Sequence, residues 1–218
     1  MESNNDATII YYSSCTEDPE FERKIQESLV KNSGGLPIVS VTQKPMDLGT
    51  NIVVGNVGQS GFNVLRQSLI ACETATTKYI ITAEADCLYS PDYFQFRPLR
   101  DDICYRNTNT YLVGYHRDYF WKKNEGGVWS QVINREFYIK RLKELLDGEL
   151  MWDAQKKNFP KEKGLKFFDE FEYFETQYPC ISFKSGKGMR KYSHSERVPI
   201  YELPYWGDSK KLIKSYYE

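Results

Sequence analysis

The sequence is poor in the residues and patterns that define several common protein classes. It has only five cysteines, Cys15, Cys72, Cys87, Cys104 and Cys180, and no two of them are spaced C-x-x-C. An odd, scattered set of this kind argues against a disulfide framework and against a zinc site. We therefore expect free thiols and a cytoplasmic location.

Long apolar runs are also missing. No stretch approaches the roughly 18 consecutive apolar residues that a membrane-spanning helix needs. The first ten residues, MESNNDATII, contain neither the basic segment nor the apolar segment of a signal peptide. We expect no membrane span and no signal peptide.

Charge and glycine patterns exclude further classes. The net charge is −1 at pH 7, so the chain as a whole has no strong field that would attract nucleic acid or an acidic membrane. The segment SGKGMR is not a phosphate-binding P-loop, because Gly188 rather than Ser or Thr follows Lys187. GNVGQSG likewise lacks the G-x-G-x-x-G pattern of a dinucleotide fold.

What the first part of the chain does contain is an alternation of strand and helix patterns. The strand patterns are continuous apolar or β-branched runs, and the helices are expected to begin at Asp18–Pro19 and at Ser60. Strands are predicted at 8–15 (TIIYYSSC), 36–43 (LPIVSVTQ), 51–56 (NIVVGN) and 78–86 (KYIITAEAD). Such alternation predicts an α/β fold with a mostly parallel sheet flanked by helices.

The pattern changes after Ser90. TYLVGYHRDYF (110–120) predicts one strand, and NREFYIKRLKELLDG (134–148) predicts an amphipathic helix that ends at Gly148. The lysine-rich residues 156–166 resemble an exposed connection. The C-terminal part reads as a strand, a basic loop and a short closing helix.

Two carboxylates, Glu84 and Asp86, follow the apolar strand KYIIT. Carboxylates near a buried position are costly unless they are paired, hydrogen-bonded or bound to a cation. In an open parallel sheet, ligands bind beyond the carboxyl ends of the strands, where these two acids are expected. Carboxylate oxygens are the ligands that Mg²⁺ and Mn²⁺ prefer. Position alone is equally compatible with a metal site and with a helix cap plus a surface acid at the start of the next turn.

Three motifs in residues 8–96 give the chain a resemblance to a known family. YYSSCTED stands at the first loop, NVGQSGFNVLRQ leads into the second helix, and AEADCLYSPDYF contains the acids. In this order and spacing they resemble the glycosyltransferases of the GT-A fold, particularly the small family-2-like enzymes of bacteria and their phages. The chain departs from the usual D-x-D motif by having Glu84 at the first acid, so Asp86 is the safer metal ligand. Beyond residue 100 the resemblance fades.

The resemblance implies a single domain over residues 1–218, with a nucleotide-sugar-binding half (1–100) and an acceptor half (101–218). It implies a nucleotide-sugar donor, UDP-linked as the first choice, and a Mn²⁺ or Mg²⁺ ion. The expected metal ligands are Asp86, Glu84 and, in a late basic loop, His194. The expected donor-binding residues are Ser13, Thr16, Glu17, Asp18, Ser60, Asn63, Arg66, Glu84, Lys187 and Arg190.

An inverting enzyme of this family also needs a base near the acceptor hydroxyl. The segment FFDEFEYFE offers Asp169, Glu170, Glu172 and Glu175 among aromatic residues, which raise a carboxylate's pKa, and the first three are the candidate bases. A retaining enzyme needs no such base. Among the tryptophans, Trp129 beside two glycines is the most site-like candidate for stacking on a sugar or base.

The acceptor is predicted less directly. It is expected to be a saccharide, a protein or modified DNA, with a hydroxymethylated base in phage DNA as the leading specific choice; the enzyme would then act in the cytoplasm of the host. A sugar-phosphate nucleotidyltransferase is the enzymatic alternative, although the acidic, glycine-free SSCTED argues against it. A catalytically inactive binding module of the same fold is the non-enzymatic alternative.

Overall fold

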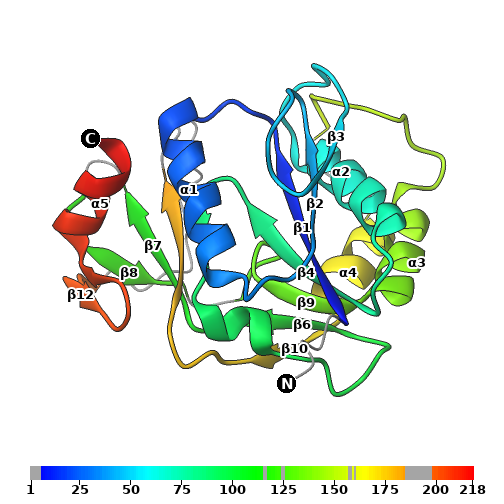
Figure 1. The fold of residues 1–218 in the computed structure, drawn as a ribbon. Coiled ribbons are helices and arrows are strands. Elements are labelled where there is room, and N and C mark those ends of the chain that lie inside the picture. The colour runs from blue at the N-terminus through cyan, green and yellow to red at the C-terminus, as the bar shows by residue number, and fades with distance from the viewer. Residues whose placement is uncertain (1–5, 115–116, 124–125, 157–158, 160, 185–197) are drawn as a thin grey trace.

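A computed structural model describes residues 6–114, 117–123, 126–156, 159, 161–184 and 198–218. These residues form a seven-stranded sheet, a four-stranded sheet and a two-stranded hairpin (Figure 1). Three of the predicted site residues lie outside the described residues: Lys187, Arg190 and His194.

The seven-stranded sheet is the frame of the molecule, and its strand order is β10-β6-β9-β4-β1-β2-β3. Strand β9 runs antiparallel to both of its neighbours, and every other pairing in the sheet is parallel. The fold class predicted from the sequence, a mostly parallel α/β sheet flanked by helices, is confirmed. The strands are β1 (Ala7–Ser13), β2 (Ile38–Thr42), β3 (Thr50–Val53), β4 (Tyr79–Glu84), β6 (Cys104–Asn107), β9 (Gln131–Asn134) and β10 (Phe171–Phe174).

Local signals place the first helices where the sequence predicts them. Helix α1 (Pro19–Asn32) begins after Asp18, whose Oδ1 accepts hydrogen bonds from the backbone N–H groups of Glu20 and Phe21. Helix α2 (Gly61–Thr74) begins after Ser60, whose Oγ accepts from the N–H of Asn63. Each side chain satisfies N–H groups that the first helical turn leaves without a partner.

Helices α2, α3 (Arg135–Leu146) and α4 (Lys161–Asp169) cover one face of the large sheet. The expectation of an exposed connection over 156–166 is wrong at its end, because α4 starts at Lys161. The helix forms because Phe167 is buried against α3, with its ring stacked 6.0 Å from that of Tyr138. Helix α1 and the short helix η1 (Pro91–Gln95) lie on the opposite face.

The four-stranded sheet has the order β5-β11-β7-β8 and packs against α1 and the C-terminal helix α5 (Ser209–Tyr217). The prediction of one strand over 110–120 is wrong: β7 and β8 are separate and antiparallel, because the chain reverses between Gly114 and Phe120. The strands are β5 (Cys87–Leu88), β7 (Thr110–Gly114), β8 (Phe120–Lys122) and β11 (Cys180–Lys184); β12 (Glu202–Leu203) and β13 (Gly207–Asp208) form the hairpin.

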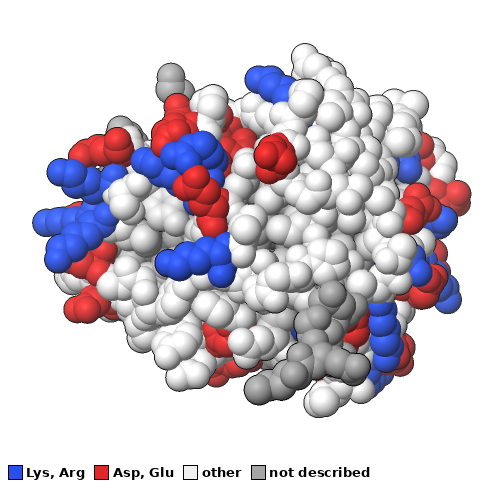
Figure 2. Space-filling view, viewed as in Figure 1, with Lys and Arg blue, Asp and Glu red and all other residues white. Residues whose placement is uncertain are grey.

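Both halves of the sequence contribute to the large sheet, since β6, β9 and β10 follow residue 100. On the surface, charged side chains gather over α1 and α5, whereas the face over β2, β3 and α2 has few (Figure 2). No helix among the described residues is long and apolar enough to cross a membrane.

Candidate active site

A cleft of about 140 Å³ opens where β1 and β4 end and α2 begins. Both strands run parallel, so their carboxyl ends meet at one edge of the sheet, where α/β proteins bind ligands. The cleft draws on all three motifs that the sequence singles out. Its lining residues are Tyr12, Ser13, Ser14, Glu17, Gly58, Gln59, Ser60, Asn63, Val64, Gln67, Glu84, Ala85 and Asp86.

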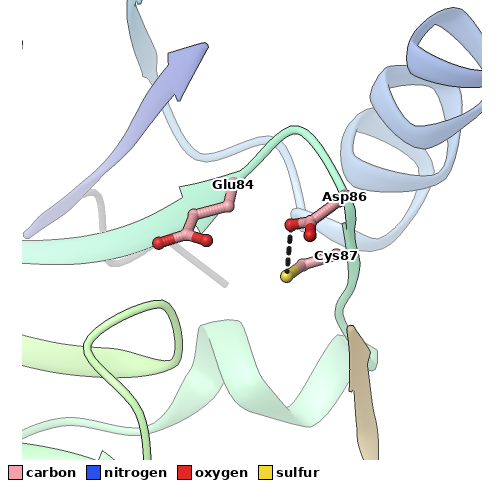
Figure 3. A group of neighbouring side chains, drawn as sticks. All are labelled: Glu84, Asp86 and Cys87. Carbon is pink, nitrogen blue, oxygen red and sulfur yellow. Dashed lines mark hydrogen bonds between the residues drawn. The ribbon is translucent and has the colours of Figure 1, made fainter. Parts of the chain in front are cut away.

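The acid pair stands at the turn between β4 and β5. Figure 3 shows the side chains of Glu84, Asp86 and Cys87 gathered at this turn, with Cys87 Sγ donating to Asp86 Oδ1 at 3.2 Å. One ligand atom from each of the three residues lies within 4.8 Å of the others. The Tyr12 hydroxyl, paired across the β1–β4 ladder, donates to Glu84 Oε1 at 3.0 Å and fixes that carboxylate.

The environment of Glu84 disfavours its negative charge. Burial, and next the charge of Asp86, raise the pKa of Glu84 to about 7, against the opposing effects of Lys184 and the Tyr12 hydroxyl. Lys184, at the end of β11, donates from Nζ to Ser182 Oγ at 2.8 Å. The acid pair therefore lies between the cleft and positive charges of the smaller sheet.

The loop that leaves β1 is held in a fixed shape. Gln67, buried on α2, donates from Nε2 to the carbonyl oxygens of Ser13 and Val41 at 3.0 and 2.8 Å. Cys15 has a φ of 53°, an uncommon conformation for a residue with a side chain, and its N–H donates to Ser13 Oγ. The wall of the cleft formed by Ser13 and Ser14 is thus set before any ligand arrives.

The opposite wall of the cleft, Gly58 to Asn63, is hydrogen-bonded to Asp153 in the second half of the chain. Ser60 Oγ donates to the carbonyl oxygen of Asp153 at 2.7 Å, and the N–H of Asp153 donates to Asn63 Oδ1 at 2.9 Å. Asn63 Nδ2 donates in turn to the carbonyl oxygens of Val57 and Gly58. Gly58 has a φ of +79°, and a Cβ there would lie 2.5 Å from the Cβ of Ala154.

The chemistry of the lining suits a divalent cation. Glu17, Glu84 and Asp86 contribute carboxylates, while no Lys, Arg or His is among the residues that line the cleft in the described part of the chain. Oxygen donors of this charge match Mg²⁺ or Mn²⁺, and the thiol of Cys87 adds a softer donor nearby.

The structure brings six of the predicted site residues together in the cleft: Ser13, Glu17, Ser60, Asn63, Glu84 and Asp86. Thr16 and Asp18 lie next to it. Thr16 shares a hydrogen bond with Ser14, and Asp18 caps α1. Arg66 faces elsewhere, since its Nη2 donates to the carbonyl oxygens of Leu146, Glu149 and Leu150 after α3.

The acids predicted as candidate bases lie on the far edge of the large sheet. Glu172 is on β10, level with Ile81 and three strands from β4, which is about 14 Å at the usual strand spacing. Its carboxylate pairs with Arg100 at 2.9 Å, and Glu170 pairs with Arg141 at 3.2 Å. The side chain of Asp169 is not among the described parts of the structure.

Sequence reasoning missed Tyr12, Ser14 and Gln67. Tyr12 and Gln67 sit in apolar or amphipathic runs and look like ordinary strand and helix residues. The available signal for Tyr12 was its place near the end of the predicted first strand (8–15), within the motif YYSSCTED. Nothing in the sequence pointed to Gln67, because its role depends on carbonyl groups of two strands that only the fold brings near it.

No family model matches the chain, and no curated protein matches its sequence. Solved structures match at low identity. The apo-form glycosyltransferase GlyE of Streptococcus pneumoniae TIGR4 has a TM-score of 0.49 and 10% identity, over 78% of this chain and 45% of that one. A glycosyltransferase involved in glycosylation of the major capsid of PBCV-1 has a TM-score of 0.46 and 9% identity, over 84% and 94%.

The bifunctional IspDF from Campylobacter jejuni matches with a TM-score of 0.44 and 12% identity, over 84% of this chain and 50% of that one. With 45% of GlyE covered, the chain spans less than half the length of that protein. Two of these three structures are glycosyltransferases, the family that the sequence resembles. All three scores lie below 0.5, so the case for a function has to come from the residues of the cleft.

Proposed function

We propose that this protein is a glycosyltransferase that moves a sugar from a nucleotide-sugar donor to an acceptor hydroxyl with the help of a divalent cation. The observation that carries the proposal is the meeting of three separate motifs in one cleft, from the β1 exit loop, the start of α2 and the β4–β5 turn. These are the motifs on which the resemblance to GT-A glycosyltransferases rests.

The charge of the cleft supports a cation-dependent donor. A nucleoside diphosphate would meet three carboxylates and no described cation among the lining residues, so the two would repel each other. Mn²⁺ or Mg²⁺, held by Asp86 and Glu84, would neutralise the charge that develops on the departing diphosphate.

The remaining residues of the cleft have positioning roles in this proposal. The Tyr12 hydroxyl keeps Glu84 oriented, and Gln67 keeps the β1 exit loop in place for the base and ribose. The first N–H groups of α2, next to Ser60, offer hydrogen-bond donors to a phosphate oxygen. The donor is proposed to be UDP-linked, and the acceptor to be a saccharide, a protein or a hydroxymethylated base in DNA.

Binding measurements test the proposal first. The thermal unfolding midpoint is followed with a panel of nucleotide sugars, with and without Mn²⁺, and with nucleoside triphosphates for comparison. A nucleotide sugar that stabilises the protein only with Mn²⁺, and not the Asp86→Asn variant, supports the proposal. Stabilisation by a triphosphate plus a sugar phosphate would favour the nucleotidyltransferase, and no response to any of them would favour the binding module.

Transfer is then measured with the donor that binds. Release of the nucleoside diphosphate is followed with saccharides, with peptides and with DNA that contains hydroxymethylated bases. An enzyme of the proposed class releases diphosphate faster with one acceptor class than with water alone. Equal release with every acceptor would contradict a transferase.

A further inference from the structure

A second group of polar side chains lies on the other side of the β4 end. Residues 126–130, which lead into β9, lie at the same sheet edge as the acid pair, because β9 runs antiparallel to β4. It is tied to Glu84 through Tyr89, whose hydroxyl accepts from the N–H of Glu84 at 3.0 Å and donates to the carbonyl oxygen of Trp129 at 2.8 Å. This region is not part of the lining of the cleft.

Two hydrogen-bond donors lie close together beside Gly127. A Cβ built on Gly127 would lie 2.4 Å from Trp129 Nε1, 2.5 Å from Trp129 Cδ1 and 2.5 Å from Lys123 Nζ, so the two nitrogens are no more than about 5 Å apart. The ammonium group also lies 5.8 Å from the centroid of the Trp129 ring. We call Lys123, Gly127 and Trp129 the oxyanion corner.

Neither donor has an acceptor within the described part of the chain. The indole ring of Trp129 lies against the ring of Tyr89 and near the ammonium group of Lys123, but its N–H donates to no described group. Lys123 Nζ likewise forms no hydrogen bond or ion pair with a described residue. Trp129 is only 7% exposed, so an unmet N–H in it is costly. Both nitrogens remain reachable, since neither is among the described polar atoms that are fully buried without a partner.

The surrounding charges favour an anion at this point. Burial, and next the repulsion from Lys184, lower the pKa of Lys123 to about 8, and Arg106 acts in the same direction, while Glu84 and Cys87 oppose them. An ammonium and an indole N–H can donate hydrogen bonds but cannot accept them. A ligand that only accepts, such as a phosphoryl or carboxylate group, satisfies both, whereas a hydroxyl group would leave its own proton without a partner.

We propose that Lys123 Nζ and the Trp129 indole N–H bind an oxyanion, and that this oxyanion belongs to the acceptor substrate. The assignment to the acceptor rests on the proposed function, because it takes the opposite flank of Glu84 as the donor cleft. The oxyanion site itself stands on the two donors alone. The acceptor would then carry a phosphoryl or carboxylate group near the hydroxyl that receives the sugar.

Nuclear magnetic resonance tests the site without any activity measurement. The chain has four tryptophans, so four indole N–H signals are expected, and Trp129→Phe identifies the relevant one. Inorganic phosphate and acetate are titrated separately, at constant ionic strength kept with chloride. The Trp129 signal is expected to shift and saturate with at least one of them, which also separates phosphoryl from carboxylate preference. The Trp206 signal should stay in place, since its Nε1 already donates to the Pro179 carbonyl oxygen at 2.6 Å.

Matched variants show whether the corner is responsible. Lys123→Met should weaken the binding of the anion about tenfold or more, because it removes a charge-assisted hydrogen bond. Gly127→Ala should weaken the shift, because the new methyl would push the side chains of both Trp129 and Lys123 out of place. Lys122→Met, at the exposed neighbour, should change nothing. An indole signal that neither anion moves, or that moves equally in Lys123→Met, overturns the oxyanion site.

A competition experiment separates this inference from the proposed function. If the corner serves the acceptor, saturating UDP with Mg²⁺, which unlike Mn²⁺ is diamagnetic and leaves the signal visible, leaves phosphate bound there, and the Trp129 shift persists. Displacement by UDP would make the corner a part of the diphosphate site and overturn the acceptor assignment. If UDP with Mg²⁺ does not bind at all, and UDP with Mn²⁺ gives no stabilisation in the thermal assay either, the proposed function and the acceptor assignment fail together, while the phosphate titration still decides the oxyanion site.

Discussion

The two flanks of the acid pair are built in opposite ways. On the flank of β1 and α2, buried amides and hydroxyls are paired with backbone groups, as with Gln67 and Asn63, and the charged groups facing the cleft are carboxylates. On the flank of β8 and β9, a lysine ammonium and an indole N–H lie close together beside Gly127 and have no acceptor among the described residues.

The difference shows what each flank leaves for a ligand to supply. The first flank is rigid and lacks positive charge, so a phosphate ligand needs a cation there. The second has unmet donors and positive charge, so an anion can bind there directly.

The largest effect is expected from Asp86→Asn, which keeps the shape of the side chain and removes its charge. Turnover should fall by about 100-fold or more, the usual result of removing a group that stabilises developing charge. Mn²⁺ binding, measured by calorimetry, should be lost in parallel. Asp101→Asn is the control, because Asp101 pairs with the exposed Lys78 at the start of β4. Normal turnover of Asp86→Asn in Mn²⁺ would remove the metal assignment.

The rigidity of the first flank is tested by Gly58→Ala against Gly55→Ala. Both glycines have a positive φ, of +79° and +77°, but only at Gly58 would the new methyl meet Ala154. Gly55→Ala should therefore lower the free energy of unfolding by about 1 kcal/mol from backbone strain alone. Gly58→Ala should lower it by about 3 kcal/mol and weaken nucleotide binding. Urea unfolding measures both.

A second-site change sharpens this pair. Ala154→Gly removes the methyl that Gly58→Ala would strike, so the double variant should regain the stability of Gly55→Ala. If Gly58→Ala and Gly55→Ala are equally stable, the contact between the two segments does not restrain the loop.

A smaller effect is expected from losing a helix cap. Ser60→Ala and Asn134→Ala remove side chains that accept from the N–H of the third residue of α2 and of α3, each at 3.1 Å. Each should cost about 1 kcal/mol of stability. Nucleotide affinity should fall only in Ser60→Ala, which also loses the bond to Asp153. Equal nucleotide affinity in both variants would show that Ser60 acts only as a helix cap.

The smallest effect concerns the charge of the second flank. The pKa of Lys123 lies near 8 in the folded protein, below the ordinary 10.5, with Lys184, Arg106, Glu84 and Cys87 around it. Between these values the unfolded chain binds more protons, so this group makes the protein more stable as pH rises from 8. Compared with Lys123→Met, the wild type should gain about 1 kcal/mol or less between pH 8 and 9.5, since Lys123 is partly exposed. A constant difference would contradict the lowered pKa.

Features that depend on neighbours in the sequence were predictable. Asp18 and Ser60 cap their helices because the N–H groups they satisfy lie two or three residues ahead. Glu84 and Asp86 were recognisable because their burial could be inferred from the strand before them. The acid site and the first half of the sheet therefore followed from local pattern.

Features that depend on distant parts of the chain were not predictable from the sequence. Arg66 resembles a ligand-binding residue in its motif, but carbonyl groups more than 75 residues away occupy its guanidinium. The antiparallel β9 reads like any short apolar run, and its direction is set by pairing with β4 and β6. The convergence of Lys123 and Trp129 depends on the path of a loop, which no periodicity encodes.

The pairing of β5 with β11 has a consequence for how the protein folds. Cys87 lies opposite Ser182, and the N–H of Phe183 donates to the carbonyl oxygen of Asp86, so the turn that presents the acids is fixed by a strand nearly half the chain away. Such a long-range contact closes slowly, because the entropy of a long loop must be overcome before the contact forms. During synthesis β1 to β4 emerge early, but the acids reach their final geometry only after residue 184 has left the ribosome. If the acids bind a cation as proposed, the geometry for it is acquired among the last steps of folding.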